Sequence, residues 1–203
     1  MRLFMKKRYP HLEDDLSLGK QILIFGWEIF KVVTISLAII IPVRYFLIQP
    51  FYVKGASMEP NFSDFEYLII NEISYRFNEP QRGEVIVFRY PHDPSQFFIK
   101  RVIGLPGEQV VIRDGQVYIK SSTSQELVVL DESAYLSATT KTGGQIDVTL
   151  GPDEYYLLGD NRAASLDSRA FGPVSRQSII GKTLLRGWPI DKVGVFKSVD
   201  YGL

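Results

Sequence analysis

The sequence FFIKRVIGLPGEQVVIRDGQVYI, residues 97–119, carries the clearest fold signal in the chain. Its two apolar runs are rich in β-branched and aromatic residues, which favour strands over helices. The segment LPGE at 105–108 is typical of a turn between them. Asp114-Gly115 divides the second run, and this pair is typical of a two-residue β-hairpin loop. The stretch therefore predicts antiparallel strands joined by tight turns.

The chain after Phe51 continues in the same way, with short strand-like runs between turn residues. These runs are YLIIN (67–71), EVIVFR (84–89), EYYLLG (154–159) and IIGKTLLR (179–186). Residues 120–145 are rich in Ser and Thr and show little periodicity, so we expect a surface loop or insertion there. The prediction for this part of the chain is a mainly β, antiparallel domain that is large enough to bury a core.

A long apolar segment, residues 21–53, leads into this domain. Residues 30–48 would extend roughly 28 Å as a helix, which is enough to cross the hydrocarbon core of a bilayer. We therefore expect an N-terminal segment at 1–29, one transmembrane helix at 30–48 and a β-domain at 49–203. Pro42 would kink this helix without forbidding it. A buried or surface-lying helix is the alternative interpretation.

The basic residues around the predicted span bear on its orientation. Those before it favour a cytoplasmic N-terminus, with the β-domain on the extracytoplasmic side of the cell membrane or of an internal membrane. They are Arg2, Lys6, Lys7, Arg8 and Lys20. Arg44 and Lys54, which follow the charge-free centre of the segment, weaken this asymmetry.

The composition excludes several classes of function. Lys+Arg and Asp+Glu are both 23, so no basic surplus points to nucleic acid. The chain has no cysteine, which excludes a disulfide framework, a thiolate nucleophile and a cysteine metal site. Its two histidines, His11 and His92, lie on opposite sides of the apolar segment, so a multi-histidine metal site is excluded as well. We expect neither a metal ion nor a cofactor.

Ser57, in KGASMEP at 54–60, is a candidate nucleophile, although the small residues beside it could equally mark a tight turn. A serine nucleophile needs a base, and His92 is the histidine on the same side of the predicted span. Lys100 is the other candidate, because it interrupts an apolar strand with Phe98 and Val102 on the same face. Burial there would lower the pKa of the amine. A lysine that reaches solvent from an edge strand is the ordinary alternative.

Four blocks in the chain occur in the order found in bacterial type I signal peptidases, which are membrane-anchored Ser–Lys endopeptidases of the leader peptidase family. They are GASMEP (55–60), RGEVIVF (82–88), KRVIGLPGE (100–108) and GDNRAASLDSRAFGPV (159–174). The chain resembles this family over most of residues 51–174. The resemblance implies the family's antiparallel β-sheet catalytic domain after an N-terminal anchor.

The resemblance also implies roles for single residues. Ser57 would be the nucleophile, Lys100 the general base and Ser165 the residue that orients the lysine amine. The Ser57 N–H would be one oxyanion donor, whereas Gly55 replaces a serine whose hydroxyl assists in some members. The residues that correspond to the family's structural ion pairs are Asp160, Arg162, Asp167 and Arg169.

The substrates implied by the resemblance are secretory preproteins, cut after a small-x-small sequence at the end of an apolar signal helix. Only nine residues separate Ile48 from Ser57, at most about 30 Å, which would hold the nucleophile near the bilayer surface. The residues that match the family's shallow pockets are Phe51, Val53, Met58, Phe62, Val87, Phe98 and Ile99. An ordinary place in the β-core is the alternative for each of them.

Three alternative functions would each require other features of the sequence. KTGG at 141–144 contains a motif of penicillin-recognising enzymes, but the S-x-x-K partner, SLGK at 17–20, precedes the predicted span. A self-cleaving repressor would need a DNA-binding region, and the chain has no basic recognition helix. A membrane-tethered binding module without catalysis would tolerate the loss of Ser57 or Lys100. The oligomeric state does not follow from the sequence.

Overall fold

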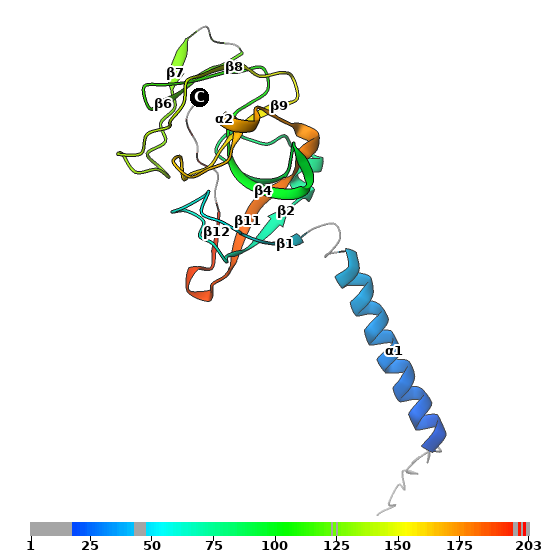
Figure 1. Ribbon diagram of the computed structural model, residues 1–203. Helices are drawn as coiled ribbons and strands as arrows, with labels where there is room; N and C mark the ends of the chain where they lie inside the picture. Colours follow the sequence, from blue (N-terminus) through cyan, green and yellow to red (C-terminus); the bar gives the residue numbers. More distant parts are fainter. Residues whose placement is uncertain are drawn as a thin grey trace, which may run out of the picture. The chain divides into compact units, whose positions relative to one another are not determined.

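The computed structural model describes residues 18–42, 48–122, 124, 126–196, 199 and 201 (Figure 1). The chain divides into two compact units, residues 1–43 and 44–203, and each is described by itself. The residues before Leu18, with most of the basic residues that favour a cytoplasmic N-terminus, lie outside the described part of the chain.

Helix α1, Leu18–Pro42, forms the first unit, and none of its 25 residues is buried. One 18-residue window has a mean hydropathy of 2.0, so by length and composition the helix could cross a membrane. Lys31 pairs with Glu28 at 2.7 Å, one turn away on the same face.

The position of this helix differs from the predicted span of 30–48. The described part of this helix runs from Leu18 to Pro42, so it includes residues 18–29, which were predicted to precede the span. Ile48, predicted to end the span, instead begins a strand and pairs with Asn71. Residues 43–47 lie outside the described residues. Because Ile48 lies in a strand of the β-domain, its short separation from Ser57 along the chain does not place the serine near a membrane.

Two antiparallel sheets form the second unit (Figure 1). The larger sheet has the strand order β1-β2-β11-β3-β4-β9-β10, and β12 pairs with β11. Its strands are β1 (Ile48–Tyr52), β2 (Tyr67–Asn71), β3 (Val85–Tyr90), β4 (Asp93–Gly104), β9 (Glu154–Leu158), β10 (Val174–Ser175), β11 (Ile179–Trp188) and β12 (Gly194–Val195). The strand pairs of the described residues are antiparallel, which confirms the predicted fold class.

The smaller sheet has the order β7-β6-β5-β8. Its strands are β5 (Gln109–Arg113), β6 (Gln116–Lys120), β7 (Leu127–Val129) and β8 (Ile146–Thr149). Asp114 and Gly115, with φ of 53° and 82°, form the turn between β5 and β6, and positive φ at both positions is what a type I′ hairpin requires. The predicted hairpin is confirmed. The region 120–145 is not only a loop, because β7 pairs with β6 within it.

Short helices complete the second unit: α2 (Ser168–Phe171), η2 (Ile73–Arg76), η3 (Arg176–Ser178) and η4 (Ile190–Lys192). One cluster of buried side chains fixes the segment between β1 and β2. Met58 and Phe62, each 1% exposed, pack in this cluster with Leu68 and Ile70 of β2. Ser57 directly precedes Met58, so its place is set by a buried neighbour, while Ser57 itself is half-buried.

Candidate active site

Ser57 and Lys100, which are 43 positions apart in the sequence, meet in the second unit. The Lys100 Nζ atom lies 2.8 Å from Ser57 Oγ, and it donates a hydrogen bond of 2.8 Å to the Ile99 carbonyl oxygen. Lys100 lies in β4 opposite Ile86 of β3, and it is 3% exposed. The alternative of a lysine that reaches solvent from an edge strand is therefore wrong.

The surroundings of Lys100 change its acidity. Burial lowers the pKa of the amine from 10.5 to about 8, because it disfavours the ammonium form, and the charges of Asp167 and Asp160 oppose this effect. The Phe98 ring centroid lies 5.4 Å from Nζ. A buried amine with a depressed pKa, in hydrogen-bond contact with a serine hydroxyl, is the arrangement that a lysine base requires.

The backbone on the N-terminal side of Ser57 is held in a tight loop. Gly55 has a φ of 94°, which side chains rarely allow, and its N–H donates to Asp64 Oδ1 at 2.9 Å. Val53 and Phe65 close the loop, since the Phe65 N–H donates to the Val53 carbonyl oxygen at 3.2 Å. The predicted oxyanion region around Gly55 is thus a tight turn beside the serine, in a conformation that glycine readily adopts.

The segment after β9 holds the other side of Ser57. The Asn161 N–H donates to the Ser57 carbonyl oxygen at 3.1 Å, and Asn161 Nδ2 donates to the Ala56 carbonyl oxygen at 3.0 Å. A Cβ atom on Gly159 would lie 2.1 Å from Ser165 Oγ and 2.5 Å from the Ser57 carbonyl oxygen. Sequence reasoning assigned no role to Gly159 or Asn161, although both belong to the last of the four blocks.

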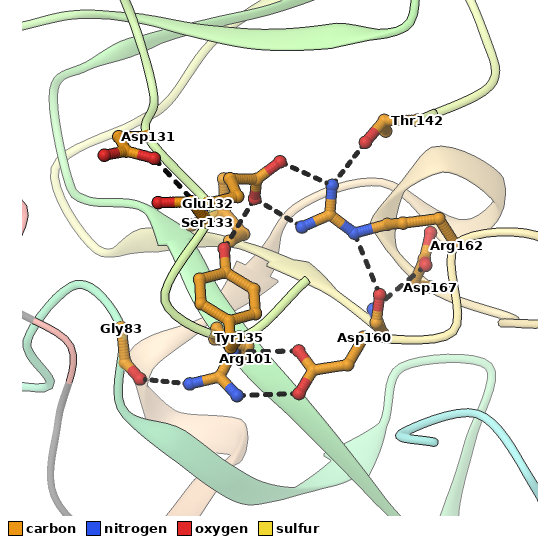
Figure 2. A network of polar contacts seen from close by, with 12 residues as sticks. Gly83, Arg101, Asp131, Glu132, Ser133, Tyr135, Thr142, Asp160, Arg162 and Asp167 are labelled. Carbon is orange, nitrogen blue, oxygen red and sulfur yellow. Dashed lines mark hydrogen bonds and ion pairs between the residues drawn. The ribbon is translucent and has the colours of Figure 1, made fainter. Parts of the chain in front are cut away.

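Each of the four residues predicted to form ion pairs does so. Asp160 accepts two hydrogen bonds from Arg101, of 2.8 and 2.6 Å, and Asp167 pairs with Arg169 at 2.8 Å. Arg162 pairs with Glu132, a residue of the Ser- and Thr-rich region that the sequence did not single out (Figure 2). Arg101 and Glu132 are thus partners that sequence reasoning missed.

Two aspartates of this segment lie near the amine and affect it electrostatically. Burial raises the pKa of the Asp167 carboxyl, but the hydrogen bond and charge of Arg169 outweigh it, so this pKa lies below its usual range. Asp167 also caps α2 and accepts a 3.1 Å hydrogen bond from the Gly159 N–H. The Asp167 charge is therefore held in place by contacts with its own segment.

Ser165 differs from the expectation that its hydroxyl orients the amine. Its Oγ atom is buried, and it forms no hydrogen bond of good geometry with any described residue, Lys100 included. It does lie close enough to Asp167 to help lower the pKa of that carboxylate. The role of Ser165 stays a prediction.

A cavity of about 430 Å³ lies over Ser57 and Lys100. Five of the seven predicted pocket residues line it, namely Phe51, Val53, Val87, Phe98 and Ile99. Met58 and Phe62 do not; both are buried in the core cluster with Leu68 and Ile70, which is the alternative position given for them, and Phe62 also lines a second cavity. Lining residues that the sequence did not suggest include Tyr52, Leu68, Phe97, Ala164 and Leu166.

Two stretches of chain form much of the wall of this cavity. One is residues 51–57, which runs from the end of β1 into the loop at Gly55, and the other is residues 96–100 of β4. On one side β4 pairs with β3, while its described pairing with β9 begins only at Arg101. The edge of residues 96–100 that faces away from β3 is therefore not paired with a strand among the described residues. A larger cavity of about 610 Å³ contains neither Ser57 nor Lys100.

His92 lies in the turn between β3 and β4 and is exposed. Its ring contacts Tyr90, at 5.4 Å between centroids. Eight residues of extended chain, roughly 25 Å, separate it from Lys100 along β4, and it does not line the cavity over Ser57. Among the described residues, no group of three or more His, Cys, Asp or Glu side chains could hold a metal ion.

Comparisons with known proteins agree with this geometry. The family model described as signal peptidase, peptidase S26, matches residues 26–188. The chain is 36% identical over 174 residues to the probable signal peptidase I-2 of Synechocystis, covering 83% of this chain and 76% of that protein.

Two further relatives carry related names. The signal peptidase I of Leptolyngbya laminosa is 36% identical over 174 residues, covering 82% of each chain. The signal peptidase IB of Staphylococcus aureus is 29% identical over 170 residues, covering 79% of this chain and 88% of that one. The candidate membrane helix fits a single-pass membrane protein of this kind. The chain therefore belongs to the signal peptidase family S26, and it is a serine endopeptidase of the signal peptidase I type.

Proposed function

We propose that the protein removes signal peptides from secretory precursors by means of a Ser57–Lys100 dyad, and that it cuts after a small-x-small sequence. The observation that carries the proposal is the 2.8 Å contact between Lys100 Nζ and Ser57 Oγ inside a groove, with the amine 3% exposed. Membership of the signal peptidase family supplies the class of substrate.

The proposed reaction begins with neutral Lys100. The amine takes the proton of the Ser57 hydroxyl while Oγ attacks the scissile carbonyl carbon, which gives a tetrahedral oxyanion and an ammonium. The ammonium then donates its proton to the leaving amine, the peptide C–N bond breaks, and an acyl-enzyme ester forms on Ser57. Lys100 next takes a proton from water, which attacks the ester, and returns it to Ser57 Oγ. The proton balance closes without a metal ion or a cofactor.

The Ser57 N–H is the proposed oxyanion donor, because it donates to no acceptor among the described residues. Gly55 has no hydroxyl to assist it. Ser165 is proposed to orient the Lys100 amine, and its hydroxyl packs against Gly159. The ion-paired residues Asp160, Arg162 and Asp167 support the loop that holds Ser57.

The precursor is proposed to bind as an extended strand in the groove. The unpaired edge of residues 96–100 and the opposite stretch 51–57 offer backbone hydrogen bonds that do not depend on side chains. Selectivity for small residues would come from the bulky walls, to which Phe51, Phe98 and Ile99 contribute. The backbone hydrogen bonds would bind precursors of different sequence, and the bulky walls would restrict the residues at the cleavage site to small ones.

The membrane topology belongs to the same proposal. We assign the crossing to α1 rather than to residues 30–48, with residues before Leu18 in the cytoplasm and the β-domain on the extracytoplasmic side. The chain has no cysteine, so a Ser95→Cys variant carries a single exposed thiol. A membrane-impermeant maleimide should label it in intact cells, and labelling only after lysis would reverse the orientation.

The decisive test of the activity uses a purified precursor with a signal peptide. Wild type should cleave it, Lys100→Ala should not, and Lys120→Ala at the end of β6 should cleave as wild type does. Mass spectrometry of the product should place the new N-terminus directly after a small-x-small sequence. Cleavage by Lys100→Ala at the wild-type rate would contradict the dyad, whereas a wild type that does not cleave the precursor would leave a binding module as the better account.

A further inference from the structure

The loop that holds Ser57 is itself held by the smaller sheet. Asn161 binds the carbonyl oxygens of Ala56 and Ser57, and its two neighbours in the chain, Asp160 and Arg162, are both ion-paired. Arg162 Nε donates to the Gly159 carbonyl oxygen at 3.0 Å, so the guanidinium fixes the start of this loop as well as its own residue. The position of Asn161 therefore depends on what holds Arg162.

The Arg162 side chain is 1% exposed, and each of the three nitrogens of its guanidinium donates to a protein acceptor (Figure 2). Nη1 donates to Glu132 Oε2 at 2.8 Å and also to Thr142 Oγ1, while Nη2 donates to Glu132 Oε1. A guanidinium stays charged at any working pH, and a buried charge without an opposite partner is strongly unfavourable. Glu132 is the one carboxylate bound to Arg162 among the described residues.

Glu132 and Thr142 belong to one connection, residues 130–142, whose two ends are fixed on β6 and the turn before it. The Leu130 N–H donates to the Val117 carbonyl oxygen at 2.8 Å, and the Thr142 N–H donates to the Gly115 carbonyl oxygen at 2.9 Å. The hairpin of the smaller sheet thus carries both residues that clamp Arg162.

Tyr135, in the middle of this connection, ties it to the Asp160 side of the loop. Its hydroxyl donates to Glu132 Oε1 at 2.5 Å, and its carbonyl oxygen accepts from Asn61 Nδ2 at 2.9 Å. Asn61 Nδ2 also donates to Asp160 Oδ2 at 2.8 Å, and the Arg101 guanidinium lies 4.0 Å from the Tyr135 ring centroid. Figure 2 shows Tyr135 between Glu132 and Arg101.

We propose that Glu132 is a positioning residue for Ser57. From the connection 130–142 it holds Arg162, and Arg162 together with Asp160 fixes Asn161. Asn161 in turn holds the backbone of the nucleophile. The inference rests on the proposed role of Ser57. Glu132 does not line the cavity over Ser57, so it acts on the serine through these contacts and not on the substrate. A displacement of about 1 Å at a nucleophile can cost a hundredfold in rate.

The test is Glu132→Gln, assayed on a signal-bearing precursor with the full-length protein. The amide keeps the shape and loses the charge, so Arg162 must seek another partner and the loop shifts. We expect kcat to fall about tenfold or more with KM unchanged. The rising limb of the kcat/KM pH profile should stay near the wild-type pH, because burial is the largest cause of the lowered Lys100 pKa and Glu132 is not among its causes. Glu132→Asp should recover part of the loss.

A stability-matched control separates positioning from general destabilisation. Ile179→Val removes a methyl group from a different buried cluster, which contains none of the residues of this network, and should lower Tm while leaving kcat unchanged. Thr142→Val, which removes one acceptor from Arg162, serves if Glu132→Gln does not fold, and it should lower kcat severalfold.

Two results distinguish failure of this inference from failure of the proposed function. If Ser57→Ala abolishes cleavage while Glu132→Gln or Thr142→Val keeps the wild-type kcat, the positioning role is wrong and the dyad stands. If Ser57→Ala cleaves as wild type does, the proposed function itself is wrong.

Discussion

The pH dependence of cleavage follows directly from the burial of Lys100. Only the neutral amine can accept the Ser57 proton, so kcat/KM should rise as the ammonium loses its proton. The pKa of this amine is lowered to about 8 by burial. Because the neutral form is the active one, activity is low below this pH and reaches its plateau above it.

The size of the effect is large enough to measure. With a pKa of about 8, roughly a tenth of the molecules carry a neutral amine at pH 7, whereas a lysine at 10.5 would be neutral in about 0.03%. The burial of Lys100 therefore increases the active fraction at pH 7 about 300-fold. Asp167 and Asp160 work against this, so the amine is not driven to a still lower pKa.

The assay is a kcat/KM profile on a short signal-like peptide from pH 5 to 11, with wild type and His92→Ala. Both proteins should give one rising limb near pH 8. A limb near pH 10.5 would mean that the amine is exposed in solution. A limb near pH 6.5 that vanishes in His92→Ala would replace lysine catalysis with histidine catalysis.

Three substitutions test other parts of the site. Ser57→Ala should be inactive, whereas Ser57→Cys should keep measurable activity because a thiol is intrinsically more nucleophilic; equal rates for the two would refute the assignment. Ser165→Ala should fold and lose roughly tenfold to a thousandfold in kcat, as expected for a supporting hydroxyl, and an unfolded variant would make Ser165 structural first. Gly159→Ala should lower both Tm and activity because its Cβ would lie 2.1 Å from Ser165 Oγ, while Gly143→Ala, with open space around it, should change neither. A Gly159→Ala protein as stable and active as wild type would contradict this packing.

The local patterns of the sequence were sufficient for the fold class. The Asp114-Gly115 turn occurs as predicted, and the apolar runs at 67–71 and 97–103 lie in β2 and β4. Strands with weaker patterns were not predicted, such as β7 in the Ser- and Thr-rich region. Such short strands owe their existence to pairing with a neighbour, here β6, which a linear pattern does not contain.

The described helix overlaps the predicted span only in part. Charge-free length favoured residues 30–48, but the described helix already includes Leu18 and continues through Glu28 and Lys31, which neutralise each other one turn apart. Counting charges along the chain misses such pairs. The described helix extends to Pro42, and the residues that follow it lie outside the described part of the chain.

Single side chains with distinctive chemistry could be proposed from the sequence. Motif and strand alternation suggested Ser57 and Lys100 as candidates, and the structure places their side chains in contact. Met58 and Phe62 were assigned to pockets and are buried in the core, because apolar residues in both places have the same composition. The sequence did not suggest the proposed role of Glu132. That role depends on its contact with Arg162, 30 residues away, which is visible only in the folded chain.

The most direct test of the Ser57–Lys100 dyad is a double-mutant comparison of precursor cleavage. Wild type, Ser57→Ala, Lys100→Ala and the double variant should be assayed under single-turnover conditions, with correct folding checked by circular dichroism. If the two residues act as one unit, each single variant should lose as much rate as the double variant. Losses that add, or a single variant that retains cleavage near the wild-type rate, would contradict the dyad.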